Sequence, residues 1–116
     1  MLDELAVTDL GVIAHARLDL RDHMTALTGE TGAGKTLLLG ALELLSGARA
    51  DATVVRTGAD QAVVEGRFST ESGDELVLRR VVLREGRSRA YRNGELVTVG
   101  ELSAAAEGLL EIHSQG

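Results

Sequence analysis

Residues Gly29–Thr36 read Gly-Glu-Thr-Gly-Ala-Gly-Lys-Thr, which completes a G-x-x-x-x-G-K-[ST] pattern. The preceding residues, Met24–Thr28, have the composition of a short buried strand, and Leu37–Leu45 is a run of helix formers. A strand, a glycine-rich loop and a helix in this order are typical of a phosphate-binding loop. The stretch therefore predicts an α/β fold of the P-loop NTPase type with a nucleotide site.

Each part of the loop has an expected role in binding ATP and Mg²⁺. The glycines let the backbone aim several N–H groups inward, and these form a nest for the β- and γ-phosphates at the positive end of the helix. Lys35, the only lysine in the chain, adds a point charge there, and the Thr36 hydroxyl is placed to ligate Mg²⁺. The expected nucleotide-binding residues of the loop are Gly29, Glu30, Thr31, Gly32, Ala33, Gly34, Lys35 and Thr36.

Composition places the chain among soluble globular proteins. Of its 116 residues 44% are hydrophobic, 26% are charged and none is cysteine or proline. The N-terminus lacks the pattern of a signal peptide, and even the longest fully apolar runs, such as Leu37–Leu39, are far too short to span a bilayer. We expect one cytoplasmic domain over residues 1–116, without disulfides and without a membrane partner.

Strand signals flank the loop on both sides. Leu2–Thr8 and Ala14–Leu20 predict two strands joined by a short turn. After the helix, which Gly47 is expected to cap, the polar stretch Ala48–Asp60 predicts a loop. Four further strands follow at Gln61–Phe68, Glu75–Arg84, Arg89–Arg92 and Glu95–Val97, with an Asn93-Gly94 hairpin before the last. This spacing predicts an antiparallel meander.

The end of the sequence predicts a short helix and then a strand. Thr98 and Glu101 form a capping box, which opens a helix through Ala106. The apolar stretch Leu109–Ile112 is predicted to be a last short strand, and His113–Gly116 leaves it. The helix that follows the phosphate loop, Leu37–Leu45, is apolar nearly all round, which predicts burial on most sides.

Arginines concentrate in the meander although the net charge of the chain is −6. Six arginines face a single acid, Glu85, within fourteen residues; they are Arg79, Arg80, Arg84, Arg87, Arg89 and Arg92. If alternate arginines share one face of the sheet, they form a strip that could follow a phosphate backbone. The alternative interpretation is a solvated sheet face or pairing with acids elsewhere in the protein.

The sequence contains no recognisable set of residues for ATP hydrolysis. ATP hydrolysis in this class needs an apolar strand that ends in a metal-binding Asp, and no segment has that pattern. The Leu45-Ser46-Gly47 stretch superficially resembles the start of an ABC signature motif, but its position favours a helix cap. The three histidines lack metal-ligand spacing.

Four motifs of the sequence are informative together: Gly29–Thr36, Gly47–Ala50, Val55–Gly58 and Ile112–Gln115. They closely resemble the RecN family of bacterial DNA-repair ATPases, which are relatives of the SMC proteins. The resemblance covers essentially the whole chain, although Ser114 stands where the family usually has glycine. It implies the N-terminal lobe of an ABC-type ATPase head with an antiparallel β meander, over residues 1–116 and ending just past the Q-loop.

The resemblance also implies residue roles. Gln115 would be the Q-loop glutamine, which touches Mg²⁺ and helps to position the attacking water. The loop near Leu10–Ile13 would lie close to the adenine, and Arg56 would approach the phosphates. The family continues with a coiled coil and then the other half of the head. This chain alone is therefore expected to be inactive as an ATPase.

The implied partners are ATP, DNA, the missing C-terminal half of the head and a second head in a head-to-head homodimer, with a nucleoid-associated, cytoplasmic location. Two alternatives stay open. An ABC-transporter-type nucleotide-binding subunit would usually carry an aromatic near its N-terminus, and the two aromatics, Phe68 and Tyr91, do not lie there. A non-hydrolytic nucleotide-binding interaction module is the other, and a small-molecule P-loop kinase is disfavoured by the antiparallel strands.

Overall fold

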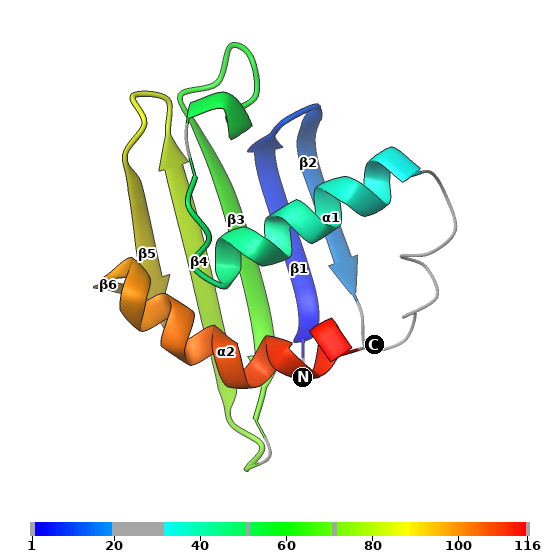
Figure 1. Cartoon of the computed structure of the whole chain (residues 1–116), viewed down its shortest axis with the longest axis vertical. Helices are drawn as coiled ribbons and strands as arrows, with labels where there is room; N and C mark the ends of the chain where they lie inside the picture. Colours follow the sequence, from blue (N-terminus) through cyan, green and yellow to red (C-terminus); the bar gives the residue numbers. More distant parts are fainter. Residues whose placement is uncertain (1, 20–31, 51, 71, 116) are drawn as a thin grey trace.

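A sheet with both helices on one face forms the protein (Figure 1), as seen in a computed structural model that describes residues 2–19, 32–50, 52–70 and 72–115. The described strands form one six-stranded antiparallel sheet in the order β2-β1-β3-β4-β5-β6. The strands are β1 Leu2–Leu10, β2 Ile13–Asp19, β3 Gln61–Ser69, β4 Glu75–Leu83, β5 Ser88–Arg92 and β6 Glu95–Val97. The helices are α1 Gly32–Leu45, the 3₁₀ turn η2 Ala52–Val54 and α2 Val99–Gln115.

The predicted hairpins and meander are confirmed. Asn93 and Gly94 both have positive φ, 50° and 85°, as a two-residue turn between antiparallel strands requires. The capping box is also present at the start of α2. The Glu101 N–H donates to Thr98 Oγ1 at 3.0 Å, and the Thr98 N–H donates to Glu101 Oε1 at 3.1 Å.

The core lies between the sheet and the two helices. Alternate residues of the central strands face the helices and are almost fully buried, and they include Leu5, Val64, Phe68, Leu78 and Val82. From the helices, Leu45 and Leu102 complete this core at 0% exposure. Burying each such large side chain contributes about 1.5–3 kcal/mol, so this face accounts for most of the packing energy.

The opposite face of the sheet carries charged side chains in cross-strand ion pairs. Arg79 lies 3.3 Å from Glu65, and Arg67 lies 3.8 Å from both Glu4 and Glu75. These pairs are partly exposed, so each adds little to stability. They fix which residues of each strand point away from the helices.

Gly47 caps the C-terminal end of α1, as the sequence predicts. Gly47 has a φ of 95°, and the Ala48 N–H donates to the Glu43 carbonyl at 3.0 Å. This is the left-handed termination that glycine permits without strain. A Cβ built on Gly47 would lie 2.7 Å from Ser103 Cβ, because α2 passes directly beside the cap. Glycine is therefore required here for two separate reasons.

Two sequence predictions are wrong. The stretch Leu109–Ile112 is not a strand, because α2 continues through it to Gln115. The apolar positions 102, 105, 106, 109 and 112 share a helical period, so the stretch extends the stripe begun at Leu102. The part of α1 whose side chains the structure describes, residues 39–45, is not buried on most sides either: Leu39 is 55% exposed and Glu43 is exposed.

Among the described residues, no helix combines the length and hydrophobicity needed to cross a bilayer.

Candidate nucleotide-binding site

The phosphate loop leads directly into α1. The backbone of Gly32–Thr36 forms the first turns of this helix, which therefore begins inside the motif and not at Leu37, where the sequence predicted it. Gly29, Glu30, Thr31 and the strand predicted at Met24–Thr28 lie outside the described residues. The side chains of Lys35 and Thr36, and that of Gln115, also lie outside them. Gln115 itself is the last residue of α2.

The loop that contains Arg56 is bound to the turn between β1 and β2. Val55 forms an isolated antiparallel bridge with Leu10, and the Arg56 N–H donates to the Asp9 carbonyl at 2.9 Å. The Gly11 N–H donates to the Val54 carbonyl at 2.8 Å. The fold therefore brings together Arg56, whose side chain is exposed, and the Leu10–Ile13 turn, two segments that are far apart in the sequence.

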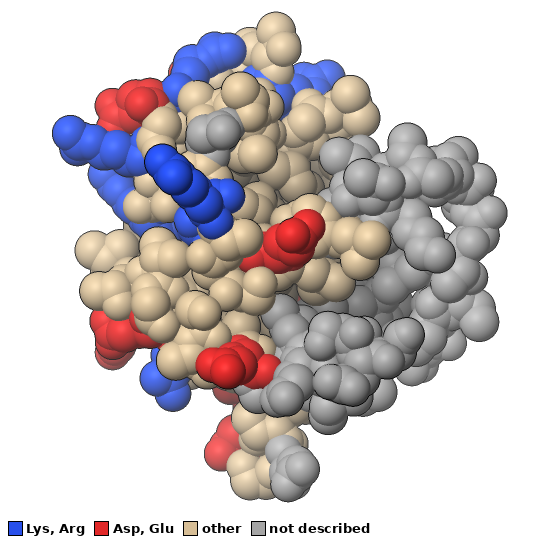
Figure 2. All heavy atoms as spheres, in the orientation of Figure 1, with Lys and Arg blue, Asp and Glu red and all other residues tan. Residues whose placement is uncertain are grey.

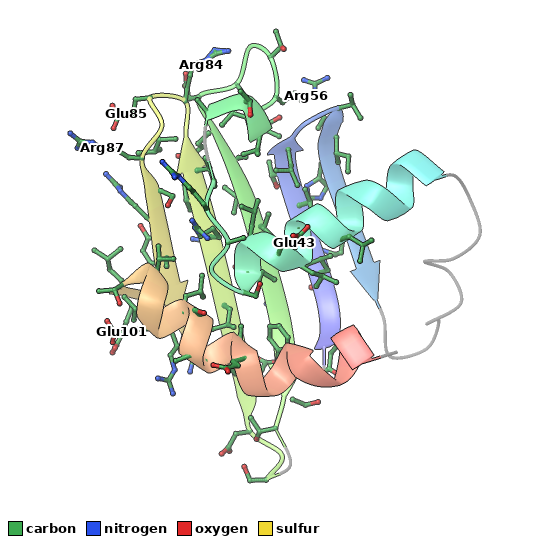
Figure 3. All side chains as sticks on the ribbon, in the orientation of Figure 1. Glu43, Arg56, Arg84, Glu85, Arg87 and Glu101 are labelled. Carbon is green, nitrogen blue, oxygen red and sulfur yellow. The ribbon has the colours of Figure 1, made fainter. Side chains whose placement is uncertain are left out.

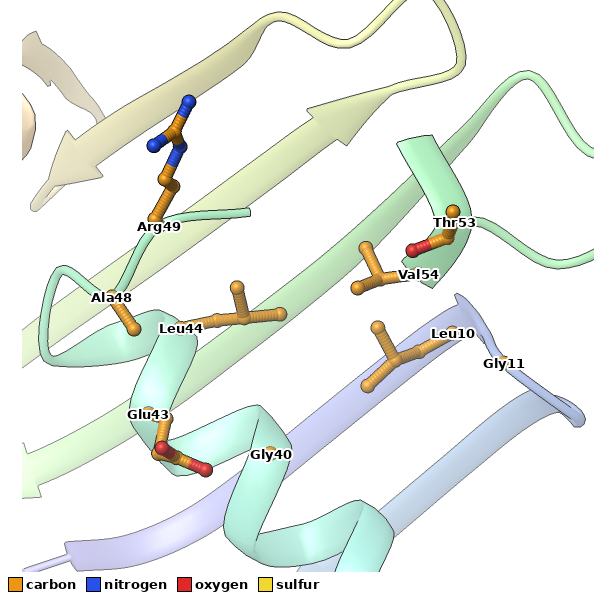
Figure 4. A pocket seen from close by; sticks show the side chains of 9 residues that line it. All are labelled: Leu10, Gly11, Gly40, Glu43, Leu44, Ala48, Arg49, Thr53 and Val54. Carbon is orange, nitrogen blue, oxygen red and sulfur yellow. The ribbon is translucent and has the colours of Figure 1, made fainter. Parts of the chain in front are cut away.

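A cavity of about 380 Å³ opens beside this junction (Figure 4). Its lining comes from the β1–β2 turn, the second half of α1, the following loop and the 3₁₀ turn η2. The lining residues are Leu10, Gly11, Gly40, Glu43, Leu44, Ala48, Arg49, Thr53 and Val54. Among these described lining residues, only Glu43 and Arg49 are charged. A mostly apolar pocket with a few polar groups at its rim suits a flat organic ring.

Sequence reasoning placed only one part of this cavity near the adenine, the Leu10–Ile13 turn. The other walls come from segments about 30 to 45 positions away, whose proximity depends on the Leu10–Val55 bridge. The available signal was Gly40, a glycine inside a run of helix formers, which indicates close approach or open space beside a helix. A Cβ at Gly40 would meet nothing within 4 Å.

Arg80 differs from the other meander arginines. It lies on the helix-facing side of β4 with 2% exposure, whereas Arg79 lies on the open side. Its Nη1 donates to the carbonyls of Leu44 and Ala48, each at 2.9 Å, and its Nη2 donates to Ser88 Oγ at 3.1 Å. Burial lowers the pKa of the Arg80 guanidinium below its usual value. Because Arg80 points into the core, the six arginines do not form one strip.

Some of the exposed arginines gather instead at one end of the sheet. Arg56, Arg84 and Arg87 all lie at the end where β3 begins and β4 ends (Figure 3). Figure 2 shows basic side chains concentrated in the same upper region of the face that carries the helices. Arg89 lies close by, near the start of β5. One acid in the same turn, Glu85, forms an ion pair with Arg87, with 3.3 Å between Arg87 Nε and Glu85 Oε1. We call Arg56, Arg84, Arg87 and Arg89 the arginine end.

Among the described residues, no group of three or more His, Cys, Asp or Glu side chains is arranged to hold a metal ion.

Comparison with solved structures defines the class of this fold. The chain superposes with a TM-score of 0.76 on a structure described as "Structural biochemistry of ATP-driven dimerization and DNA stimulated activation of SMC ATPases", at 23% identity, covering 90% of this chain and 76% of that one. A structure described as "Structure of the recombination mediator protein RecF-ATPrS in RecFOR pathway" gives a TM-score of 0.72 at 20% identity, over 88% of this chain and 29% of that one. The fold is that of an ABC-type ATPase head of the SMC and RecF kind.

Comparison with curated protein sequences shows which proteins of this fold class are similar to the chain in sequence. The DNA repair protein RecN of Mycobacterium tuberculosis strain H37Rv is 42% identical over an alignment that covers 99% of this chain and 23% of the relative. RecN of Streptomyces coelicolor is 44% identical, over 96% of this chain and 22% of the relative. RecN of Vibrio cholerae is 34% identical, over 99% and 24% respectively. No protein-family model matches the chain.

Over essentially its whole length, the chain is therefore similar to part of the RecN proteins, and the resemblance seen in its motifs is confirmed. It spans about 23% of the length of the curated relatives.

Proposed function

We propose that the chain is the nucleotide-binding lobe of a RecN-like DNA-repair ATPase. The observation that carries this proposal is the Gly29–Thr36 motif, which runs into α1 within a fold of the ATPase-head class. The loop N–H groups and Lys35 bind the β- and γ-phosphates of ATP, and Thr36 with Gln115 ligates Mg²⁺. In the full-length protein, residues 1–116 form one lobe of a head that pairs with a second head.

The cavity beside Leu10 is the proposed position of the adenine. Support comes from its apolar lining and from its place along α1, because Gly40 lies eight residues after Gly32. That spacing is about 12 Å along the helix axis, which is of the order of the length of a nucleotide. The family resemblance alone supports a role for Arg56 near the phosphates, because the backbone of Arg56 is held against the Leu10 turn, at the proposed base end of the site.

Titration with a fluorescent ATP analogue in the presence of Mg²⁺ tests the phosphate loop. In the full-length protein, Lys35→Ala should weaken binding by about 1.5–3 kcal/mol, the usual contribution of a charge-assisted hydrogen bond. Arg79→Gln, an exposed charge removed from the opposite sheet face, is the matched control and should bind like the wild type. An unchanged affinity in Lys35→Ala would remove the basis of the proposal.

Gly40 offers a separate test of the adenine position. A leucine at this position would project into the cavity, whereas an alanine would meet nothing within 4 Å. We expect Gly40→Leu to weaken the binding of ATP and to leave the binding of inorganic triphosphate unchanged. Gly40→Ala should bind both ligands normally. Equal affinity of Gly40→Leu and wild type for ATP would exclude this cavity as the base site.

DNA is the proposed macromolecular partner, reached through the arginine end. Support comes from the exposure of these four side chains at one end of a chain whose net charge is −6. A double charge reversal, Arg87→Glu with Arg89→Glu, should lower DNA affinity and make its dependence on salt shallower while ATP binding is kept. Unchanged DNA binding would show that these arginines are only solvated.

A further inference from the structure

Arg80 is a buried cation that no described carboxylate neutralises. It is 2% exposed, and among the described residues no Asp or Glu lies within ion-pair distance of its guanidinium. Its Nε has no hydrogen-bond partner in the described part of the chain. Placing an unpaired charge in a core is costly, and an apolar side chain of the same volume would avoid that cost. The charge at this position therefore has a purpose other than filling space.

The groups that Arg80 does contact belong to the end of α1. Its Nη1 donates to the Leu44 carbonyl inside the last turn and to the Ala48 carbonyl just beyond the cap, both at 2.9 Å. The Leu44 carbonyl accepts the Gly47 N–H at 3.2 Å as well, and it lies at the negative end of the helix dipole, so a cation is favourable there. On its other side, Nη2 donates to Ser88 Oγ in β5 at 3.1 Å. One side chain thus joins α1 to two strands.

The same end of α1 is restrained from a second direction. The Gly47 cap lies against Ser103 of α2 so closely that an added Cβ would stand 2.7 Å from Ser103 Cβ. The helix has 14 residues, about 21 Å, and its first turn is the end of the phosphate loop. Since a helix moves as a rigid rod, fixing its last turn also limits where its first turn can lie. On another side of α1, by contrast, Leu39 and Glu43 are exposed.

We propose that Arg80 is a positioning residue for the nucleotide: it clamps the C-terminal turn of α1 to β4 and β5 and thereby sets the place of the phosphate loop at the other end. The inference rests on the proposed nucleotide site. It differs from a purely structural role because it requires Arg80 to change the affinity of folded protein for nucleotide, and not only the fraction that is folded.

Three variants in the full-length protein separate these roles. Arg80→Met keeps the approximate length of the side chain and removes the charge and all three hydrogen bonds. Arg80→Lys keeps a cation that can reach the two carbonyls but loses the fork that also reaches Ser88. Ser88→Ala removes only the contact to β5. Arg79→Gln, next in sequence and on the opposite face, is the control.

The measurements are the dissociation constant for the fluorescent ATP analogue and the rate of amide hydrogen exchange in residues 44–48. We expect Arg80→Met to raise the dissociation constant by roughly 3- to 30-fold, the range seen for residues that act on a site through the structure. Exchange in residues 44–48 should become faster. Arg80→Lys should recover part of the affinity, Ser88→Ala should show a smaller loss, and Arg79→Gln should show none.

An unchanged dissociation constant in folded Arg80→Met would overturn the inference, even if that variant is less stable. If Arg80→Met does not fold, the test rests on Arg80→Lys and Ser88→Ala. Wild-type affinity for the ATP analogue in both variants would overturn the inference. Failure of the proposed function has a different signature, because wild-type protein would then not bind the analogue or Lys35→Ala would bind it equally well. Binding by wild type, loss in Lys35→Ala and no effect at Arg80 would contradict the positioning role alone.

Discussion

Replacing Gly47 by alanine tests the packing at the end of α1. The change introduces two separate costs. An L-residue at a φ of 95° costs roughly 1–2 kcal/mol because its Cβ approaches the carbonyl oxygen. The new Cβ would also lie 2.7 Å from Ser103 Cβ and 3.3 Å from Ser103 Cα, well inside the optimal carbon–carbon separation of about 3.5–4.0 Å. Relieving that overlap requires a shift of α2, which costs about 1–3 kcal/mol.

The two costs together predict that Gly47→Ala lowers the free energy of unfolding by roughly 2–5 kcal/mol. Gly73→Ala is the matched control, because Gly73 has a φ of 91° and open space around it. It should lose only the backbone part, about 1–2 kcal/mol. Equilibrium urea unfolding, followed by circular dichroism, measures both losses.

A second variant isolates the contact itself. Adding Ser103→Gly to Gly47→Ala removes the Cβ that the new methyl group meets, so part of the stability should return. If Gly47→Ala and Gly73→Ala lose the same free energy, and Ser103→Gly restores nothing, then α2 does not pass beside the cap as described. The restraint of α1 from two sides would be contradicted by the same result.

Three further predictions concern other parts of the fold. Thr98→Ala should remove the capping box of α2 and cost about 1 kcal/mol in urea unfolding, and a loss near zero would refute the cap. Phe68→Ala, which empties the largest fully buried site, should cost roughly 3–5 kcal/mol in the same assay. Arg87→Glu with Arg89→Glu should reduce the salt slope of DNA binding by about one unit for every phosphate that these arginines neutralise, whereas Arg92→Glu, at the other end of β5, should leave the slope unchanged.

Most of the fold could be predicted from local signals that the tertiary structure does not override. The Asn93-Gly94 turn, the capping box at Thr98 and the cap at Gly47 each depend on backbone geometry that few residues can adopt. The alternation of apolar residues in β3 also survives, because one face of that strand lies on the core.

The predictions that failed needed information from elsewhere in the chain. Leu109–Ile112 is short and apolar, and a run of that length has no distinct period until it is aligned with Leu102 and Ala106. For α1, composition could not tell which side rests on the sheet, so the exposure of Leu39 was missed. The cavity beside Leu10 depends on long-range pairing that no local pattern reveals.

The burial of the Arg80 side chain could have been predicted in part from the sequence. Adjacent residues of a strand point to opposite faces, so Arg79 and Arg80 cannot both face solvent when one face of β4 is covered. The sequence contained this constraint, but not the acceptors that stabilise the buried charge, which come from α1 and β5. Placing the arginine end needed the same long-range information.

Amide hydrogen exchange with and without MgATP tests the central claim most directly. In the full-length protein, nucleotide should slow exchange in the peptide that spans Gly29–Leu37, since the loop N–H groups become hydrogen-bonded to phosphate oxygens. The same addition to the Lys35→Ala variant should protect this peptide little. Protection confined to other segments, or none in Gly29–Leu37 at saturating MgATP, would contradict the assignment of this loop as the nucleotide site.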